Sequence, residues 1–382
     1  MSVVEINEID RILRDAQSLR ASDVHISADE APRARVDGAL VPMRGYETAL
    51  SAAWVESALL ALMTSRQRDE FATDNEIDLS HDVPGVGRFR VNVFRQLGHV
   101  AAALRLVPET TASLSDLGIP DIAREFATRP RGLVLVTGPT GSGKSTTLTA
   151  MVDVINESMP SHIITIEDPI EYIHPSKMAL IHQREVGSDT ASFAEALRRV
   201  LRQDPDVILI GELRDPESIA VALSAAETGQ LVLATLHTQG AAKSINRIVD
   251  AFPAHQQEQV RAQLGDSLQG VISQTLLPRA QSAGRVVATE VLVQTPAVAN
   301  LVREGQIQQL YSVMQSGSGV GMHTLDQSLQ ELVASGAVAH QVARQYAIDP
   351  HALDGVRVRP KDLDAEAWVS HLPGHASVGG RF

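Results

Sequence analysis

The sequence contains no cysteine, which excludes a disulfide framework and a cysteine-ligated zinc site and is compatible with a reducing compartment. Aromatic residues make up only 3% of the chain, so few side chains are available to stack on nucleic acid bases. The formal net charge of −13 also argues against a nucleic acid partner, because binding to phosphate backbones requires a basic surface.

Long hydrophobic runs are missing as well. The longest apolar stretches, such as residues 207–210 and 231–234, have the length of a β-strand and cannot cross a bilayer. The first ten residues show no basic segment followed by an apolar run, so we expect no signal peptide. We therefore expect a cytoplasmic protein without a transmembrane segment, which could still dock on a membrane complex.

The chain has 382 residues, more than a single hydrophobic core usually holds, which predicts two domains. Residues 1–107 combine an amphipathic helix pattern over 5–20 with short alternating segments, so we expect a small α+β domain. Residues 108–130 hold three prolines and are expected to form a linker. The second domain would span residues 131–353, and residues 354–382 lose periodicity, which predicts a poorly ordered tail.

The second domain alternates apolar strands with helical stretches. Near-continuous apolar runs, typical of parallel strands buried on both faces, lie at 133–137, 163–167, 207–211 and 231–236. Helical patterns lie at 146–158, 190–203 and 215–228. The predicted fold class is therefore α/β, with helices on both faces of the sheet. After residue 255 we expect largely helical structure.

The most informative segment is the glycine-rich loop after the first of these strands. Its pattern, Gly138-x-x-x-x-Gly143-Lys144-Ser145, is typical of loops that bind nucleoside triphosphates. Glycines let the backbone N–H groups approach the phosphates, and the following helix directs its positive end at the same anion. Lys144 is expected to reach the β- and γ-phosphates, and the Ser145 hydroxyl to bind Mg²⁺. The predicted ATP-binding residues are Gly138, Pro139, Thr140, Gly141, Ser142, Gly143, Lys144, Ser145 and Thr146.

Polar side chains follow the other apolar strands. Glu167 and Asp168 end the second strand, Glu212 ends the third and His237 ends the fourth. Because ligands of open α/β sheets bind at the carboxyl ends of the strands, we expect the acids to gather around the γ-phosphate. Carboxylates there can hold a metal ion or orient an attacking water, and the histidine can sense the phosphate or the water. Acids at strand ends can also simply be solvated or cap the next helix, as we expect for Asp215.

Two arginines, Arg90 and Arg105, lie on the strands that close the first domain. A strand arginine often faces solvent or forms an ion pair, whereas triphosphatases often need an arginine to neutralise developing charge. The residues alone leave both interpretations open.

These segments together resemble the secretion ATPase superfamily of type II secretion, type IV pili and related systems, and most closely its pilus-retraction branch. The resemblance covers residues 1–353. It rests on the Walker A loop, an acidic motif, the Walker B motif and a histidine motif, at 138–146, 165–172, 204–215 and 228–238. Residues 297–304 are similar to a C-terminal motif of the retraction branch but have Ala299 where that branch has arginine.

The resemblance implies a homo-hexamer in which an N-terminal PAS-like domain packs on the RecA-like domain of the next subunit. It implies that Arg90 and Arg105 reach the nucleotide across a domain or subunit boundary. It further implies that Glu212 positions the water and Glu167 joins Ser145 and Asp168 in the Mg²⁺ shell, although the roles of the two glutamates could be exchanged. ATP hydrolysis would move the domains about the linker.

The implied function is pilus retraction through an inner-membrane platform protein, by an ATPase associated peripherally with the inner face of the cytoplasmic membrane. Two alternatives share the same nucleotide-binding residues. One is an accessory or extension ATPase of a type IV pilus or type II secretion system, and the other is a nucleic acid translocase. Extension ATPases typically carry a four-cysteine zinc site, and this sequence has no cysteine.

Overall fold

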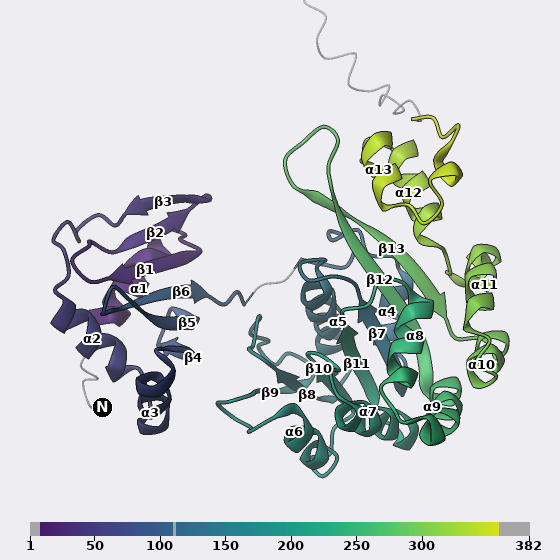
Figure 1. Cartoon of the computed structure of the whole chain (residues 1–382), viewed down its shortest axis with the longest axis horizontal. Coiled ribbons are helices and arrows are strands. Elements are labelled where there is room, and N and C mark those ends of the chain that lie inside the picture. The colour runs from purple at the N-terminus through teal and green to yellow at the C-terminus, as the bar shows by residue number, and fades with distance from the viewer. Residues whose placement is uncertain (1–7, 110–111, 359–382) are drawn as a thin grey trace, which may run out of the picture.

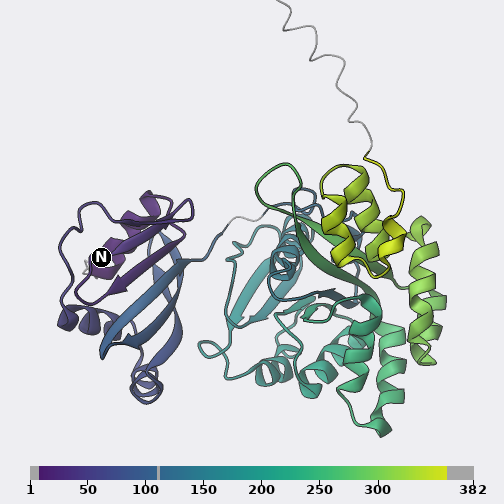
Figure 2. The same ribbon diagram turned by 45° about the horizontal axis from the view of Figure 1, so that its top comes forward.

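The computed structural model of the protein describes residues 8–109 and 112–358. Its elements gather into an N-terminal body (residues 8–106) and a C-terminal body (residues 113–358), which lie side by side in both views (Figure 1, Figure 2). Each body has its own hydrophobic core. Among the residues described, no helix is both long and apolar enough to cross a bilayer.

The N-terminal body is an antiparallel sheet with the strand order β3-β2-β1-β6-β5-β4, packed against helices. Its elements are α1 (Glu8–Ser18), β1 (Asp23–Ser27), β2 (Arg33–Val36), β3 (Ala39–Pro42), α2 (Ala52–Ala61), α3 (Ser65–Asp74), β4 (Glu76–Val83), β5 (Gly87–Gln96) and β6 (His99–Leu106). Ile9, Leu13 and Ala16 of α1 are buried, as the three- and four-residue spacing predicts. The predicted α+β composition of this part of the chain is confirmed.

The C-terminal body is built on a sheet with the strand order β13-β12-β7-β11-β10-β8-β9, parallel except for β13. The strands are β7 (Gly132–Thr137), β8 (His162–Glu167), β9 (Leu180–Glu185), β10 (Val207–Ile210), β11 (Leu231–Leu236), β12 (Leu268–Pro278) and β13 (Arg285–Val293). Every residue of β7, β10 and β11 is buried. The prediction of a parallel sheet covered on both faces is therefore confirmed.

Helices surround this sheet (Figure 1). They are α4 (Ile122–Ala127), α5 (Lys144–Ser158), α6 (Phe193–Val200), α7 (Pro216–Thr228), α8 (Ala241–Asp250), α9 (Ala254–Ser267), α10 (Pro296–Arg303), α11 (Leu310–Ser316), α12 (Leu325–Ala334) and α13 (His340–Tyr346). Short 3₁₀ turns are η1 (Ile307–Gln309), η2 (Ser318–Val320) and η3 (Pro350–Leu353). Asp215 caps α7 as predicted, because its carboxylate accepts the Ser218 N–H at 2.9 Å.

The prediction of largely helical structure after residue 255 is wrong for β12 and β13, which form a long antiparallel pair. β12 lies inside the sheet between β7 and β13 and is buried along most of its length. A strand buried on both faces shows no alternation, so periodicity does not distinguish it from a buried helix. The edge strand β9 is a further element that the sequence pattern did not predict.

Residues 108–130, predicted as a linker, contribute to the C-terminal core from Leu114 onward. The buried side chains include Leu114, Ile119 and Phe126, and α4 packs on α5 and β12. We keep the division into two domains as a proposal and place the start of the second near Leu114. Of the predicted tail, residues 359–382 lie outside the described residues.

Gly270 in β12 lies against the ring of buried Phe126, and a Cβ at this position would lie 2.2 Å from the ring Cζ. We expect Gly270→Ala to lower the free energy of unfolding by about 1–3 kcal/mol, because a close-packed core accommodates an added methyl only with strain. Gly319→Ala is the control, since nothing lies within 4 Å of a Cβ there. Denaturant unfolding of the full chain measures both, and equal midpoints would contradict the packing argument.

Candidate functional site

The glycine-rich loop connects β7 to α5, which begins at Lys144. Gly138, Gly141 and Gly143 all have positive φ, at 141°, 78° and 89°. At Gly138 a Cβ would also lie 2.3 Å from the carbonyl oxygen of Gln274 in β12. Glycine is therefore required at this position both by backbone conformation and by the neighbouring strand.

The Lys144 ammonium folds back over this loop. It donates to the carbonyl oxygens of Gly138 and Pro139, each at 3.0 Å, and to Nδ1 of His237 at 3.4 Å. Burial lowers the pKa of Lys144, and the charges of Glu212 and Glu171 oppose this effect. Phosphate oxygens would offer these N–H donors charged acceptors in place of neutral ones, which makes stronger hydrogen bonds.

Glu212 follows β10 and has partners on both carboxylate oxygens. Arg214 donates to Oε2 through Nε and Nη2, both at 2.7 Å, and His237 Nε2 lies 3.0 Å from Oε1. Burial raises the pKa of Glu212, but the hydrogen bonds from Arg214 and His237 and the charge of Arg214 outweigh it, so the pKa lies below its usual value. The carboxylate is therefore an ionised acceptor beside the phosphate loop.

His237 follows β11 and bridges the lysine and the glutamate. Because Lys144 can only donate, the His237 ring accepts at Nδ1 and donates at Nε2 to Glu212. A movement of either partner would thus change the hydrogen bonding of the other.

Glu167, the last residue of β8, is fixed by two donors. Its Oε1 accepts the Thr165 hydroxyl at 2.6 Å and the Gln183 side-chain amide at 3.2 Å. Burial raises the pKa of Glu167, and these hydrogen bonds oppose that effect. The pKa of Glu212 is thus lowered, which favours its charged form, whereas the pKa of Glu167 is raised, which favours its neutral form.

These groups line one cavity of about 250 Å³ at the carboxyl ends of the strands. The lining includes the predicted residues Thr140, Gly141, Lys144, Ser145, Glu167, Asp168, Glu212 and His237, joined by Glu171, His174 and Arg214. The structure thus brings together the predicted loop, acids and histidine.

Arg90 and Arg105 do not line this cavity within one chain. Arg105 projects from β6 with a side chain that is 69% exposed and pairs with Asp23 at 2.7 Å. Arg90 lines a smaller cavity of about 190 Å³ between the two bodies, whose walls also include Asp168 and Glu185.

Sequence reasoning missed several contributors to the site. Arg214 stands two residues after Glu212, a spacing that could have suggested its pairing. Gln183 could not have been found, because it lies on β9, the strand that was not predicted.

The donor set of the cavity fits Mg²⁺, which prefers oxygen ligands: the Ser145 hydroxyl and the carboxylates of Glu167 and Asp168 all reach it. Across residues 8–109 and 112–358, no group of three or more histidine, aspartate or glutamate side chains is arranged to hold a metal ion by itself. Such a site suits an ion that keeps water and phosphate oxygens among its ligands.

The chain matches the family described as "Type II/IV secretion system protein" over residues 2–351. It belongs to this family. It is 48% identical to the type IV pilus retraction ATPase PilT of Pseudomonas aeruginosa, over 90% of this chain and 99% of that protein. It is 53% identical to a twitching motility protein of Neisseria gonorrhoeae, over 78% of this chain and 80% of the relative.

Among solved structures, the pilus retraction motor PilT with bound ADP superposes with a TM-score of 0.82 at 46% identity, covering 90% of this chain and 97% of that one. The predicted family and the predicted α/β fold are therefore confirmed.

His174 is buried in the wall of the cavity, and its burial makes the stability of the folded chain depend on pH. Burial lowers its pKa from 6.5 to about 4; Asp153 opposes the shift and Lys177 adds to it. Between these values the unfolded chain binds more protons than the folded chain, so stability should fall as the pH drops from 6.5 towards 4. The loss attributable to His174 should reach up to about 3 kcal/mol.

The measurement is denaturant unfolding of the wild type and His174→Gln at pH 7.5 and at about pH 4.5. Other groups titrate in the same range, so the quantity of interest is the difference between the two proteins. The variant should lose less stability on acidification, and a parallel loss in both proteins would contradict the assignment.

Proposed function

We propose that this protein is an ATP-driven motor that works as a homo-hexamer and powers type IV pilus retraction, and hence twitching motility, by removing pilin subunits. The observation that carries the proposal is the meeting of the phosphate loop, Glu212 and His237 in one cavity. The pilus assignment is supported by the two relatives above, a type IV pilus retraction ATPase and a twitching motility protein, which this chain covers over 99% and 80% of their lengths. The chain is accordingly a P-loop ATPase.

The loop residues 138–146 would hold the phosphates through backbone N–H groups, with Lys144 at the β- and γ-phosphates. Ser145, Glu167 and Asp168 would hold Mg²⁺, which neutralises charge on the phosphate oxygens when bound. Glu167 already receives two hydrogen bonds that fix its carboxylate in the cavity wall.

Glu212 is the residue to which we assign the attacking water. Its lowered pKa keeps it ionised, and its side chain is 18% exposed towards the cavity, so an oxygen can accept a hydrogen bond from water. His237 would link the γ-phosphate to Glu212. A phosphate that binds Lys144 would remove the hydrogen-bond donor of His237 Nδ1, and the ring that donates to Glu212 could then shift.

Arg90 and Arg105 would complete the site across the boundary between bodies or between subunits. This assignment is supported by the position of Arg90 beside Asp168 in the cavity between the bodies and by the exposed side chain of Arg105. The ring would act on an inner-membrane platform protein from the cytoplasmic side. A nucleic acid partner is disfavoured by the net charge of −13.

Lys144→Ala and Glu212→Gln separate nucleotide binding from hydrolysis. Lys144→Ala should abolish both, whereas Glu212→Gln should retain ATP binding and lower kcat by about 10²–10⁴-fold, because it removes the group that orients the water. Phosphate release and binding of a fluorescent ATP analogue measure the two effects on the purified full chain. Glu217→Gln is the control, since this exposed acid on α7 pairs with Arg198 outside the cavity. Equal phosphate release by all four proteins would contradict the proposal.

The direction of pilus movement is tested in the source bacterium by deleting the gene and complementing it with wild type or Glu212→Gln. The Glu212→Gln strain should keep or increase its surface pili and lose twitching, because assembly continues without removal of subunits. Loss of pili would instead assign the chain to pilus extension, and unchanged twitching would assign it an accessory role.

A further inference from the structure

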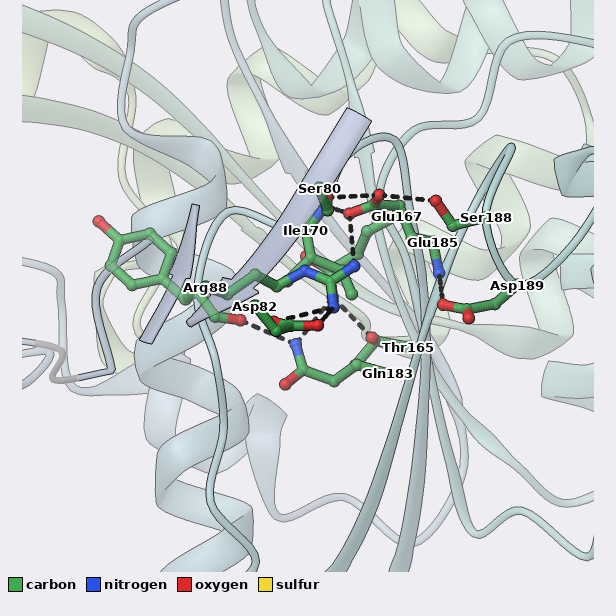
Figure 3. A network of polar contacts seen from close by, with 11 residues as sticks. Ser80, Asp82, Arg88, Thr165, Glu167, Ile170, Gln183, Glu185, Ser188 and Asp189 are labelled. Carbon is green, nitrogen blue, oxygen red and sulfur yellow. Dashed lines mark hydrogen bonds and ion pairs between the residues drawn. The ribbon is translucent and has the colours of Figure 1, made fainter. Parts of the chain in front are cut away.

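Glu185, at the end of the edge strand β9, is a buried carboxylate that contacts both bodies of the chain (Figure 3). Only 3% of the residue is exposed. From the N-terminal body, the Ser80 hydroxyl of β4 donates to its Oε1 at 2.7 Å, and the Arg88 guanidinium of β5 lies 3.4 Å from its Oε2. In the described part of the chain, Arg88 is the one cation in an ion pair with it.

The same carboxylate holds the C-terminal body. The backbone N–H of Ile170 donates to Oε2 at 3.1 Å, and the Ser188 hydroxyl donates to Oε1 at 3.2 Å. Oε1 therefore accepts one hydroxyl group from each body, whereas Oε2 accepts the Ile170 N–H and forms an ion pair with Arg88. Such partners stabilise a buried carboxylate, because its charge has lost the solvation of water.

Gln183 lies two residues earlier on β9 and so shares the strand face of Glu185. Its side-chain amide donates to the Glu167 carboxylate at 3.2 Å and to the carbonyl oxygen of Tyr172 at 2.8 Å. One face of β9 therefore fixes the segment 167–172 at its beginning, at Ile170 and at its end (Figure 3). This segment carries Glu167 and Asp168 into the nucleotide cavity.

We propose that Glu185 is a positioning residue that couples the placement of the N-terminal body to the segment 167–172, and through it to Glu167. This inference rests on the proposed function, because the output of the coupling is ATP hydrolysis. If the N-terminal body moves away, Ser80 and Arg88 leave Glu185 together. Water then replaces these two partners, the carboxylate is no longer fixed from the side of the N-terminal body, and the acceptor that it offers to the Ile170 N–H can shift.

Arg88 has a role separate from that of Arg90 in this arrangement. The two arginines stand on the same face of β5, two residues apart. Arg88 reaches Glu185, whereas Arg90 lines the cavity beside Asp168 and Glu185. Arg88 therefore acts on the placement of the segment 167–172. Arg66 of α3 donates a further hydrogen bond to the backbone carbonyl oxygen of Gly187, two residues after Glu185.

The test compares the steady ATPase activity of the full chain with Glu185→Gln, Arg88→Gln and the double variant. Glu185→Gln keeps the size and one acceptor oxygen but removes the charge. Each single variant should lower kcat at least ten-fold with KM changed less than three-fold, since binding groups are untouched. The kcat of the double variant should lie within two-fold of the kcat of the less active single variant, because both substitutions break the same ion pair. Singles with wild-type kcat, or effects that multiply, would overturn the proposal.

Hydrogen exchange of the nucleotide-free protein supplies a readout that general destabilisation would not reproduce. In both single variants, exchange should quicken in peptides covering 167–172, where the Ile170 N–H loses its fixed acceptor, while β7 and β11 keep wild-type protection. Arg88→Gln makes this readout independent of any folding defect of the Glu185 variant. Faster exchange throughout the sheet, or none in 167–172, would overturn the coupling.

Glu56→Gln is the matched control. Glu56 pairs at 3.3 Å with Arg95, which stands on the same strand as Arg88, but this pair lies wholly within the N-terminal body. Its kcat should stay within two-fold of wild type. If wild type and Glu56→Gln both fail to hydrolyse ATP, the proposed function fails; if both are active and the Arg88 and Glu185 variants equal them, only the coupling fails.

Discussion

The register of the parallel strands is the constraint on which the site depends. β11 pairs with β7 up to Leu236 and Thr137, and β10 pairs with β11 and β8 up to Ile210. Gly138, His237, Glu212 and Glu167 all stand within two residues of the ends of these ladders. Because the strands are buried on both faces, a shift of register would expose apolar side chains, so the distances among the four groups are held by the core.

The charged side chains of the cavity compensate one another. Lys144, His237, Glu212 and Arg214 form a continuous chain of contacts that alternates donors and acceptors. This chain keeps Glu212 ionised and supplies Lys144 with partners in a site where its burial is unfavourable. A triphosphate adds negative charge beside the lysine, so its arrival must redistribute these contacts, which is how binding can prepare hydrolysis.

Local patterns sufficed to predict the phosphate loop and the strand-end residues Glu167, Glu212 and His237, because each stands directly after a recognisable apolar run. The pair β12–β13 and the edge strand β9 depend on long-range pairing that no local period reveals. For the same reason the partners supplied by β9 stayed hidden. No signal in the sequence pointed to Arg88, and the structure distinguishes it from Arg90 by its ion pairs with Asp82 and Glu185.

The contacts of Glu185 join the two bodies of the chain through polar groups. Each body keeps its own apolar core, and the interactions that join them at β9 are hydrogen bonds and an ion pair. Polar contacts at such a boundary can be exchanged for water, whereas an apolar joint would resist opening. The burial of the Glu185 charge limits that exchange, because its donors must be replaced together. A polar joint with one buried charge therefore links the placement of the N-terminal body seen in this structure to the segment that carries Glu167.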